Sequence, residues 1–379
     1  MKQNPTSPAH LLDNLRPDIR EMSSYHVPDA SGLIKLDAME NPYELPLELK
    51  QKLADELAQV ALNRYPVPSY DALKQNLKAY AKVPDGFEMI LGNGSDELIA
   101  LLSTALAKLP RENHHERATI LAPAPSFVMY KASALMNHVN FVEVPLLKTD
   151  TDFQLDPLAM VMAIEEHRPA LVYLPYPNNP TGAEFDRADM VAVIEAAHQR
   201  QAFVVVDEAY QPFASYTWMA DLAQFENLLV MRTVSKLGLA GVRLGYMVGR
   251  SDVISELDKV RPPYNVNVLT ECAVNVVLGH ADVLEQQAVQ IRATRHDLMA
   301  SLQQMSGVCV FNSNANFVLV ELLNHDASEV FEALKARGIL VKNMTHAHPL
   351  LRNCLRLTVG SVEENQSLIE AMRAVESTI

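Results

Sequence analysis

The sequence has no segment suited to a membrane. No apolar run approaches the length of a membrane span, and the polar start MKQNPTSPAH contains no apolar core of the kind that signal peptides carry. The three cysteines, Cys272, Cys309 and Cys354, are odd in number and widely spaced, so they predict neither a disulfide framework nor a zinc site. We therefore expect a cytoplasmic protein without a membrane partner.

Basic residues are too few for a general nucleic-acid binder. The 32 lysines and arginines stand against 46 acidic residues, and the formal net charge of −14 is opposite in sign to the electrostatic footprint of such a protein. His346 and His348 are without acidic or cysteine partners, so no metal site is predicted. The stretch GNGSDE lacks the last glycine of a dinucleotide fingerprint and the Gly-Lys pair of a P-loop.

The pattern of apolar residues predicts an α/β fold. A length of 379 residues exceeds one ordinary core, which favours two domains. Helical segments such as 47–62, 70–83 and 190–201 alternate with short apolar or β-branched runs at 117–123, 141–146, 170–175, 203–209 and 227–233. This alternation predicts a mostly parallel central sheet sandwiched by helices, with ligands at the carboxyl ends of its strands.

The pattern changes after Arg261-Pro262-Pro263. A long helical region at 266–305 is followed by apolar runs at 308–311, 316–322 and 354–360, with a helical segment at 328–338. This order is typical of a smaller α+β domain. We predict an N-terminal arm at 1–38, a large domain at 39–262 and a small C-terminal domain at 263–379.

The stretch RTVSKLGLAGVRLGY is rich in cations. Between Asn227 and Ser251 the chain carries Arg232, Lys236, Arg243 and Arg250 but no acidic residue. One interpretation is a solvated loop with outward charges. The other is a pocket for an anion, with one lysine held for chemistry. The apolar flanks favour the pocket, because burying unpaired cations is costly unless an anion joins them.

Two further predicted strand ends carry polar side chains. In LVYLPYPNNPTG the run stops at Pro175 and a turn presents Asn178 and Asn179; this segment alone could be no more than a good turn. In FVVVDEAY, Asp207 directly follows a buried run. Asp207 is either the N-cap of a following helix or a functional carboxylate.

Together, Asn179, Asp207, Tyr210 and Lys236 meet the needs of pyridoxal phosphate, which requires a lysine, a carboxylate for its ring nitrogen and hydrogen-bonding groups for its phenolic oxygen. The ordered motifs NNPTG, DEAY, SK and AGVRLGY resemble fold-type I aminotransferases. The stretches LDAMENPY, LNRYPVPSY, GNGSDELI, RPPYNVN and CLRLTVGS resemble the histidinol-phosphate aminotransferase family within them. Lys236 and Arg243 are seven residues apart, where many relatives have eight.

The resemblance implies three catalytic residues. Lys236 would form the Schiff base with the cofactor and move protons, Asp207 would pair with the ring nitrogen, and Tyr210 would hydrogen-bond the phenolic oxygen. Asn179 would share that oxygen. Phe127 matches the residue that stacks on the cofactor ring, although a core position is the plain alternative.

The resemblance also places the cofactor phosphate. Ser235 and Arg243 would bind it together with backbone N–H groups at Gly94, Ser95 and Asp96, where a Gly-rich turn capped by Ser95 leads into a helix. The side chains of Asp96 and Glu97 would repel a phosphate, so either the backbone donors dominate or these side chains point away.

Other residues are assigned by the resemblance alone. Tyr65 matches a tyrosine that reaches the cofactor phosphate of a neighbouring subunit, which implies a homodimer. Tyr25 and Tyr264 match residues of the substrate pocket, although each tyrosine could also be a half-buried surface aromatic. Arg356 would grip the substrate carboxylate or phosphate, with Lys342 as a second cation or as an ordinary exposed lysine.

The expected reaction is transamination of histidinol phosphate with 2-oxoglutarate, giving imidazole-acetol phosphate and glutamate in histidine biosynthesis. Three alternatives stay open: an aromatic or broad-range amino-acid aminotransferase, a pyridoxal-phosphate decarboxylase of a phosphorylated amino acid, and a cofactor-binding regulator without turnover. The regulator ranks last, because this acidic chain has no basic N-terminal domain.

Overall fold

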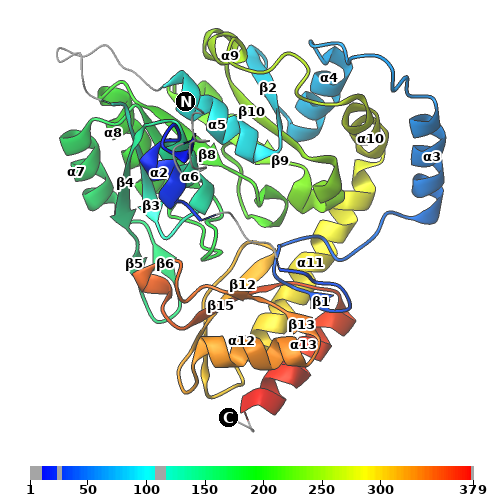
Figure 1. Cartoon of the computed structure of the whole chain (residues 1–379), viewed down its shortest axis with the longest axis vertical. Coiled ribbons are helices and arrows are strands. Elements are labelled where there is room, and N and C mark those ends of the chain that lie inside the picture. Colours follow the sequence, from blue (N-terminus) through cyan, green and yellow to red (C-terminus); the bar gives the residue numbers. More distant parts are fainter. Residues whose placement is uncertain (1–10, 24–27, 107–116, 377–379) are drawn as a thin grey trace, which may run out of the picture.

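A computed structural model describes residues 11–23, 28–106 and 117–376 of the chain. Its main feature is a seven-stranded sheet with the strand order β2-β10-β9-β8-β7-β3-β4 (Figure 1). The strands are β2 (Phe87–Asn93), β3 (Thr119–Ala124), β4 (Asn140–Pro145), β7 (Leu171–Pro175), β8 (Phe203–Asp207), β9 (Leu228–Thr233) and β10 (Leu244–Arg250). The neighbours from β9 to β4 are parallel, and β10 is antiparallel to both β9 and β2. The predicted mostly parallel sheet is confirmed.

Both faces of this sheet are buried, as the unbroken apolar runs predict. Along β8, Val204 and Val206 belong to one hydrophobic cluster, whereas Val205 belongs to the cluster on the opposite face. All three are fully buried, and each such side chain contributes roughly 2 kcal/mol of burial free energy. The period of two therefore places alternate residues against different helices.

The helices divide between the two hydrophobic clusters, one on each face of the sheet. The cluster that contains Val205 takes side chains from α5 (Ser95–Ala105), α6 (Val128–Met136) and α9 (Ser251–Asp258). The other takes side chains from α4 (Asp71–Ala81), α7 (Pro157–His167), α8 (Arg187–Gln199) and α10 (Val268–Leu278). α3 (Leu47–Ala58) packs against α10. These layers confirm the fold-type I architecture expected from the sequence.

Strands β2 and β10 were not predicted. β10 contains Gly245 and Gly249, and glycine weakens the sequence signal of a strand. The structure needs both residues: a Cβ at Gly245 would lie 2.6 Å from the carbonyl carbon of Gly94, and one at Gly249 would lie 2.2 Å from a methyl of Leu229. Close packing against the start of α5 at Gly245 and against Leu229 of β9 at Gly249 thus explains why this strand carries glycine at two positions.

The C-terminal part forms a separate antiparallel sheet with the order β11-β12-β15-β14. Its strands are β11 (Val308–Val310), β12 (Phe317–Leu322), β15 (Cys354–Thr358) and β14 (Lys342–Asn343), and its helices are α11 (Ala281–Leu302), α12 (Ala327–Ala336) and α13 (Val362–Glu376). The helical region predicted at 266–305 is two helices, which break at Gly279 and His280. α11 extends from the large sheet's layers toward the small sheet (Figure 1). The domain boundaries themselves stay a prediction.

The N-terminal segment contacts this smaller unit. It contains α2 (Pro17–Glu21) and β1 (Ile34–Lys35), and β1 pairs in parallel with β13 (Ile339–Leu340). A hairpin of β5 (Leu147–Lys148) and β6 (Phe153–Gln154) extends from the large sheet toward the smaller unit (Figure 1). Within it, Lys148 pairs with Glu321 of β12 at 2.9 Å. No described helix has the length and apolar character needed to cross a membrane.

Candidate active site

A pocket lies at the carboxyl ends of the parallel strands. β7, β8 and β9 end at Pro175, Asp207 and Thr233, and all three residues line it. Nine residues singled out from the sequence also lie there: Ser95, Asp96, Phe127, Asn179, Asp207, Tyr210, Ser235, Lys236 and Arg243. The structure thus gathers side chains that are up to 148 positions apart, from Ser95 to Arg243, at the edge where such sheets bind ligands.

Lys236 follows β9 in the turn Ser235–Leu239, and its amine points into this pocket. Nζ donates to the carbonyl oxygen of Ala38 at 3.1 Å and lies 5.9 Å from the centre of the Tyr210 ring. Within the described parts of the chain, no carboxylate forms an ion pair with it. Burial, followed by the positive charge of Arg356, lowers the pKa of Lys236 to about 8. The amine can therefore become a neutral nucleophile or base near physiological pH.

The arginines around Lys236 differ from the sequence prediction of unpaired cations. Arg232 is buried and forms an ion pair with Glu208 at 2.8 Å, and Arg243 pairs with Asp96 at 3.3 Å. Arg250 pairs with Asp252, one residue beyond the acid-free stretch from Asn227 to Ser251. That part of the prediction is wrong, because pairing across strands and helices brings in acids that are distant in sequence. Of the cations in this stretch, only Lys236 forms no ion pair with a described carboxylate, as the sequence predicted.

Asp207 lines the pocket and is the last residue of β8. Its Oδ1 accepts the N–H of Ala209 at 3.0 Å, and its Oδ2 accepts the hydroxyl of Tyr130 at 2.6 Å. Burial raises the pKa of Asp207 to about 6, and the hydrogen bond from Tyr130 opposes that rise. The N-cap of the following turn, Gln211–Phe213, is Tyr210, so Asp207 is not a helix cap.

Asn179, Tyr210 and Arg356 form a hydrogen-bonded chain between the two sheets. Nη1 of Arg356 donates to Oδ1 of Asn179 at 2.7 Å, and Nδ2 of Asn179 donates to the Tyr210 hydroxyl at 3.2 Å. That hydroxyl in turn donates to the sulfur of Met39 at 3.0 Å. Asn178 points elsewhere, because its amide donates to Pro125 and Thr181 within the turn. Only the second asparagine of NNPTG therefore faces the pocket.

The start of α5 forms one corner of the pocket. The residue at the N-cap is Gly94, with φ +78°, and Ser95 is the first helical residue without a side-chain cap, so the predicted Ser95 cap is wrong. A Cβ on Gly94 would lie 2.6 Å from Nη2 of Arg243, so glycine is what lets this guanidinium approach the helix start. Backbone N–H groups and a cation at a helix N-terminus favour an anion.

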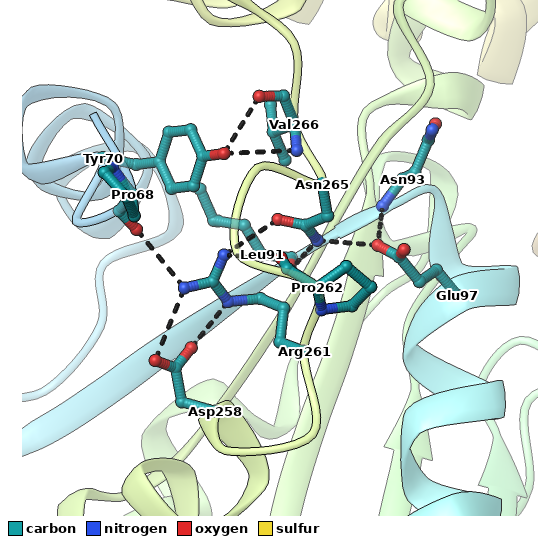
Figure 2. Close-up of polar contacts among 10 residues, drawn as sticks. All are labelled: Pro68, Tyr70, Leu91, Asn93, Glu97, Asp258, Arg261, Pro262, Asn265 and Val266. Carbon is teal, nitrogen blue, oxygen red and sulfur yellow. Dashed lines mark hydrogen bonds and ion pairs between the residues drawn. The ribbon is translucent and has the colours of Figure 1, made fainter. Parts of the chain in front are cut away.

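Glu97 and Asp96 differ in direction. Oε2 of Glu97 accepts the N–H of Asn93 and the amide of Asn265, both at 2.7 Å (Figure 2). Glu97 does not line the pocket. Asp96 lines the pocket and pairs with Arg243. Of the two alternatives, Glu97 therefore points away, whereas at Asp96 the backbone donors and Arg243 must outweigh the carboxylate.

A second cavity adjoins the first and shares Met39, Phe127 and Asn179 with it. Arg356 and Lys342 both line it. These two residues are direct partners in the antiparallel pair of β14 and β15, so their two positively charged side chains lie on one face of that sheet. This juxtaposition supports a binding site for a strongly anionic group.

Tyr65 and Tyr264 lie outside both cavities. Their rings stack with centroids 4.5 Å apart, and the side chains are 78% and 45% exposed. The loop that carries Tyr264 is held by Arg261, which donates to Asp258, Asn265 and the carbonyl oxygen of Pro68 (Figure 2). Tyr25 lies outside the described residues.

Among the side chains of the first pocket that can act chemically, sequence reasoning missed Tyr130 and Met39. Tyr130 lies in the first turn of α6, three positions after its N-cap Phe127, and this closeness to Phe127 could have found it. Met39 has the uncommon φ of +55° and was visible only as part of LDAMENPY. Among the described residues no group of histidine, cysteine or acidic side chains could hold a metal ion.

Comparison with known proteins agrees with the resemblance to aminotransferases that the motifs indicated. A family model described as aminotransferase class I and II matches residues 31–372. The chain is 55% identical over 362 residues to histidinol-phosphate aminotransferase 1 of Ralstonia nicotianae, covering 95% of this chain and 94% of that protein. It is 53% identical over 362 residues to histidinol-phosphate aminotransferase 2 of Cupriavidus pinatubonensis, covering 95% and 96%.

Solved structures share the fold at low sequence identity. The histidinol-phosphate aminotransferase of Clostridium acetobutylicum superimposes with a TM-score of 0.82 at 22% identity, covering 92% of this chain and 100% of that chain. The L-threonine-O-3-phosphate decarboxylase of Porphyromonas gingivalis gives 0.76 at 20% identity, covering 91% and 100%. Since an aminotransferase and a decarboxylase both match, these structures support the fold alone.

Proposed function

The chain belongs to the class I and II aminotransferases, and from this we propose that it transfers the amino group of histidinol phosphate to 2-oxoglutarate with pyridoxal phosphate as cofactor. The products are imidazole-acetol phosphate and glutamate, and the reaction is a step of histidine biosynthesis. Relatives that share about half of their residues with this chain over 95% of its length carry the same activity in their names.

The first pocket fits the proposed cofactor. Its lining includes an amine that forms no ion pair with a described carboxylate, a buried carboxylate, and the start of a helix with Arg243 beside it. Pyridoxal phosphate needs a nucleophile for its aldehyde, an anion for its ring nitrogen and donors for its phosphate, and the three places supply them. When bound, it supplies an aldehyde that takes up amino groups and a protonated ring that accepts electrons.

Each side chain has a defined task in this account. Nζ of Lys236 would hold the cofactor by its aldehyde and would carry the proton at the substrate α carbon; its lowered pKa suits that role. Asp207 holds the proton of the ring nitrogen. Tyr210 and Asn179 donate to the phenolic oxygen, and Phe127 covers the ring. Ser235, Arg243 and the N–H groups of Gly94, Ser95 and Asp96 bind the phosphate.

One observation carries the choice of substrate. Arg356 and Lys342 face each other across β15 and β14, and Arg356 also donates to Asn179 of the cofactor pocket. A bidentate arginine can hold the carboxylate of glutamate or the phosphate of histidinol phosphate, and the second cation favours the dianion. One position thereby serves both half-reactions.

Steady-state turnover tests this proposal. Purified protein loaded with pyridoxal phosphate should form glutamate from 2-oxoglutarate when histidinol phosphate is the donor, with kcat/KM at least tenfold above that for phenylalanine or tyrosine. Equal or better turnover with the aromatic amino acids would favour a broad-range aminotransferase. Release of carbon dioxide from a phosphorylated amino acid, without glutamate formation, would favour a decarboxylase.

We also propose a homodimer in which Tyr65 contributes to the cofactor site of the other subunit. Its ring is largely exposed, lies outside the pocket of its own chain and is held by Tyr264. The neighbouring Leu62 and Val67 are 72% and 68% exposed, which suits a surface that a partner covers. Residence in the cytoplasm stays a prediction from the sequence, which cell fractionation tests.

A further inference from the structure

Tyr130 makes the shortest hydrogen bond to the carboxylate of Asp207. The hydroxyl of Tyr130 lies 2.6 Å from Oδ2, while Oδ1 is 3.0 Å from the N–H of Ala209. Tyr130 is fully buried and Asp207 is 5% exposed, so water cannot readily replace the phenol. Hydrogen bonds to a charged group in such surroundings are stronger than neutral ones.

The ring of Tyr130 is fixed from both sides. It stacks on Tyr173 with centroids 4.1 Å apart and planes within 5°, and it meets the edge of Phe127 at 5.7 Å. The Tyr173 hydroxyl is also buried, but within the described part of the chain it has no hydrogen-bond partner. The two stacked phenols therefore share one buried environment, but only the hydroxyl of Tyr130 donates to the carboxylate of Asp207.

Tyr130 acts as a permanent donor. Burial and the negative charge of Asp207 raise the pKa of this phenol well above its usual value, so it stays protonated at every pH at which the protein functions. A donor of this kind stabilises the carboxylate over the carboxylic acid. Burial raises the pKa of Asp207, and the negative charges of Asp96 and Glu208 raise it further, so these groups act in the opposite direction to Tyr130.

We propose that Tyr130 is a positioning residue that keeps the proton shared by Asp207 and the cofactor on the ring nitrogen of the cofactor. This inference rests on the proposed function. A proton between a buried carboxylate and a pyridine nitrogen can lie on either atom. By stabilising the carboxylate, Tyr130 makes it the weaker base, so the nitrogen retains the proton. The electron-accepting power of the ring depends on that proton.

Nitrogen NMR of the loaded protein tests this directly. Pyridoxal phosphate labelled with ¹⁵N in the ring is bound to the wild type, to Tyr130→Phe and to Tyr173→Phe. The first variant removes the hydroxyl and keeps the stacked ring; the second is the matched control, which removes a hydroxyl that the carboxylate does not use. In the wild type and the control the ¹⁵N shift should be that of a protonated pyridine. In Tyr130→Phe it should move toward that of a neutral pyridine, and kcat should fall about tenfold, as expected for one lost hydrogen bond to a charged group.

Two further measurements keep the outcome clear. Infrared difference spectra should show a new protonated carboxyl band in Tyr130→Phe that is absent from Tyr130→Phe/Asp207→Asn. Replacing Tyr130 with a fluorinated tyrosine, a stronger donor in the same shape, should leave the nitrogen protonated even if the phenylalanine variant folds poorly.

An unchanged ¹⁵N shift in Tyr130→Phe, or an equal change in Tyr173→Phe, overturns the proposed role of Tyr130. A wild type that binds no pyridoxal phosphate would instead overturn the proposed function. The two failures are therefore distinct.

Discussion

The guanidinium of Arg356 donates to the amide oxygen of Asn179 over 2.7 Å, although 177 residues separate the two. Arg356 belongs to β15 of the small sheet, and Asn179 lies in the turn after β7 of the large one. The same asparagine donates to the hydroxyl of Tyr210 in the cofactor pocket. The cation proposed to hold the substrate anion is therefore directly connected to the group proposed to bind the cofactor's phenolic oxygen.

Arg356→Ala should damage both half-reactions. The change removes a guanidinium that is 7% exposed and that donates to Asn179 and to the carbonyl oxygen of Asp37. Loss of a bidentate contact worth about 3 kcal/mol predicts that kcat/KM falls roughly 100-fold for glutamate and for histidinol phosphate. Arg356→Lys should recover only part of it, because lysine lacks the planar fork. An effect on one substrate alone would contradict the shared role.

Lys342→Ala should discriminate between the two substrates. Without this cation the KM for histidinol phosphate should rise about tenfold, as expected for one charge-assisted bond of about 1.5 kcal/mol, while the KM for glutamate changes little. Lys335→Ala, which removes an exposed lysine of α12, is the control for net charge. Equal losses for both substrates would favour the broad-range alternative.

Asp207→Asn should affect stability and activity in opposite directions. The folded protein raises the pKa of this carboxyl from 3.8 to about 6, so without cofactor the wild type loses stability as the pH rises from about 4 through 6. Above that window the buried charge costs about 3 kcal/mol. The cofactor-free variant should therefore melt at a higher temperature than the cofactor-free wild type at pH 7.5 and at a similar one near pH 4.

With cofactor bound, the Asp207→Asn protein should retain little activity, because an amide cannot hold the ring proton. Asp150→Asn, at an exposed carboxylate, is the control for both measurements. Activity within a few-fold of the wild type would show that another group serves the ring nitrogen.

The pH dependence of cofactor capture reports on Lys236. Only the neutral amine attacks an aldehyde, and burial with the charge of Arg356 lowers its pKa from 10.5 to about 8. The rate at which cofactor-free protein takes up pyridoxal phosphate, followed by stopped-flow absorbance, should rise between pH 7 and 9 and then level off. In Arg356→Ala the midpoint should move to higher pH. A midpoint near that of free lysine would contradict the electrostatic account.

Subunit mixing tests the proposed dimer. Lys236→Ala and Tyr65→Ala proteins should each be nearly inactive alone. After exchange, half of the dimers are hybrids with one intact site, so about a quarter of the wild-type activity should return. Copurification through two different tags shows whether exchange has occurred. Exchange without recovered activity would argue that Tyr65 does not act across the interface.

The parallel core was predictable because its signal is local. Val204, Val205 and Val206 form an apolar run that any sheet buried on two faces requires. β10 was missed because packing against Gly94 and Leu229 demands glycine where strand-forming residues would be expected. That demand comes from segments far away in the sequence.

The same reason explains what was predictable in the pocket. Lys236 and Asp207 follow strand ends, so their position at one edge of the sheet could be inferred from the order of motifs. The partner of Arg232 is Glu208, and the partner of Asp207 is Tyr130, 77 positions earlier. Such pairs form only when the chain is folded, so neither could be read from residues close in sequence.

The central claim is that Lys236 holds the cofactor and that histidinol phosphate releases it. Borohydride reduction of the loaded protein, followed by peptide mass spectrometry, tests both parts. The account predicts that reduction fixes the cofactor on the peptide containing Lys236. It also predicts that incubation with histidinol phosphate before reduction abolishes this label, whereas phenylalanine at the same concentration leaves most of it. A label on a different lysine, or one that histidinol phosphate does not diminish, would contradict the account.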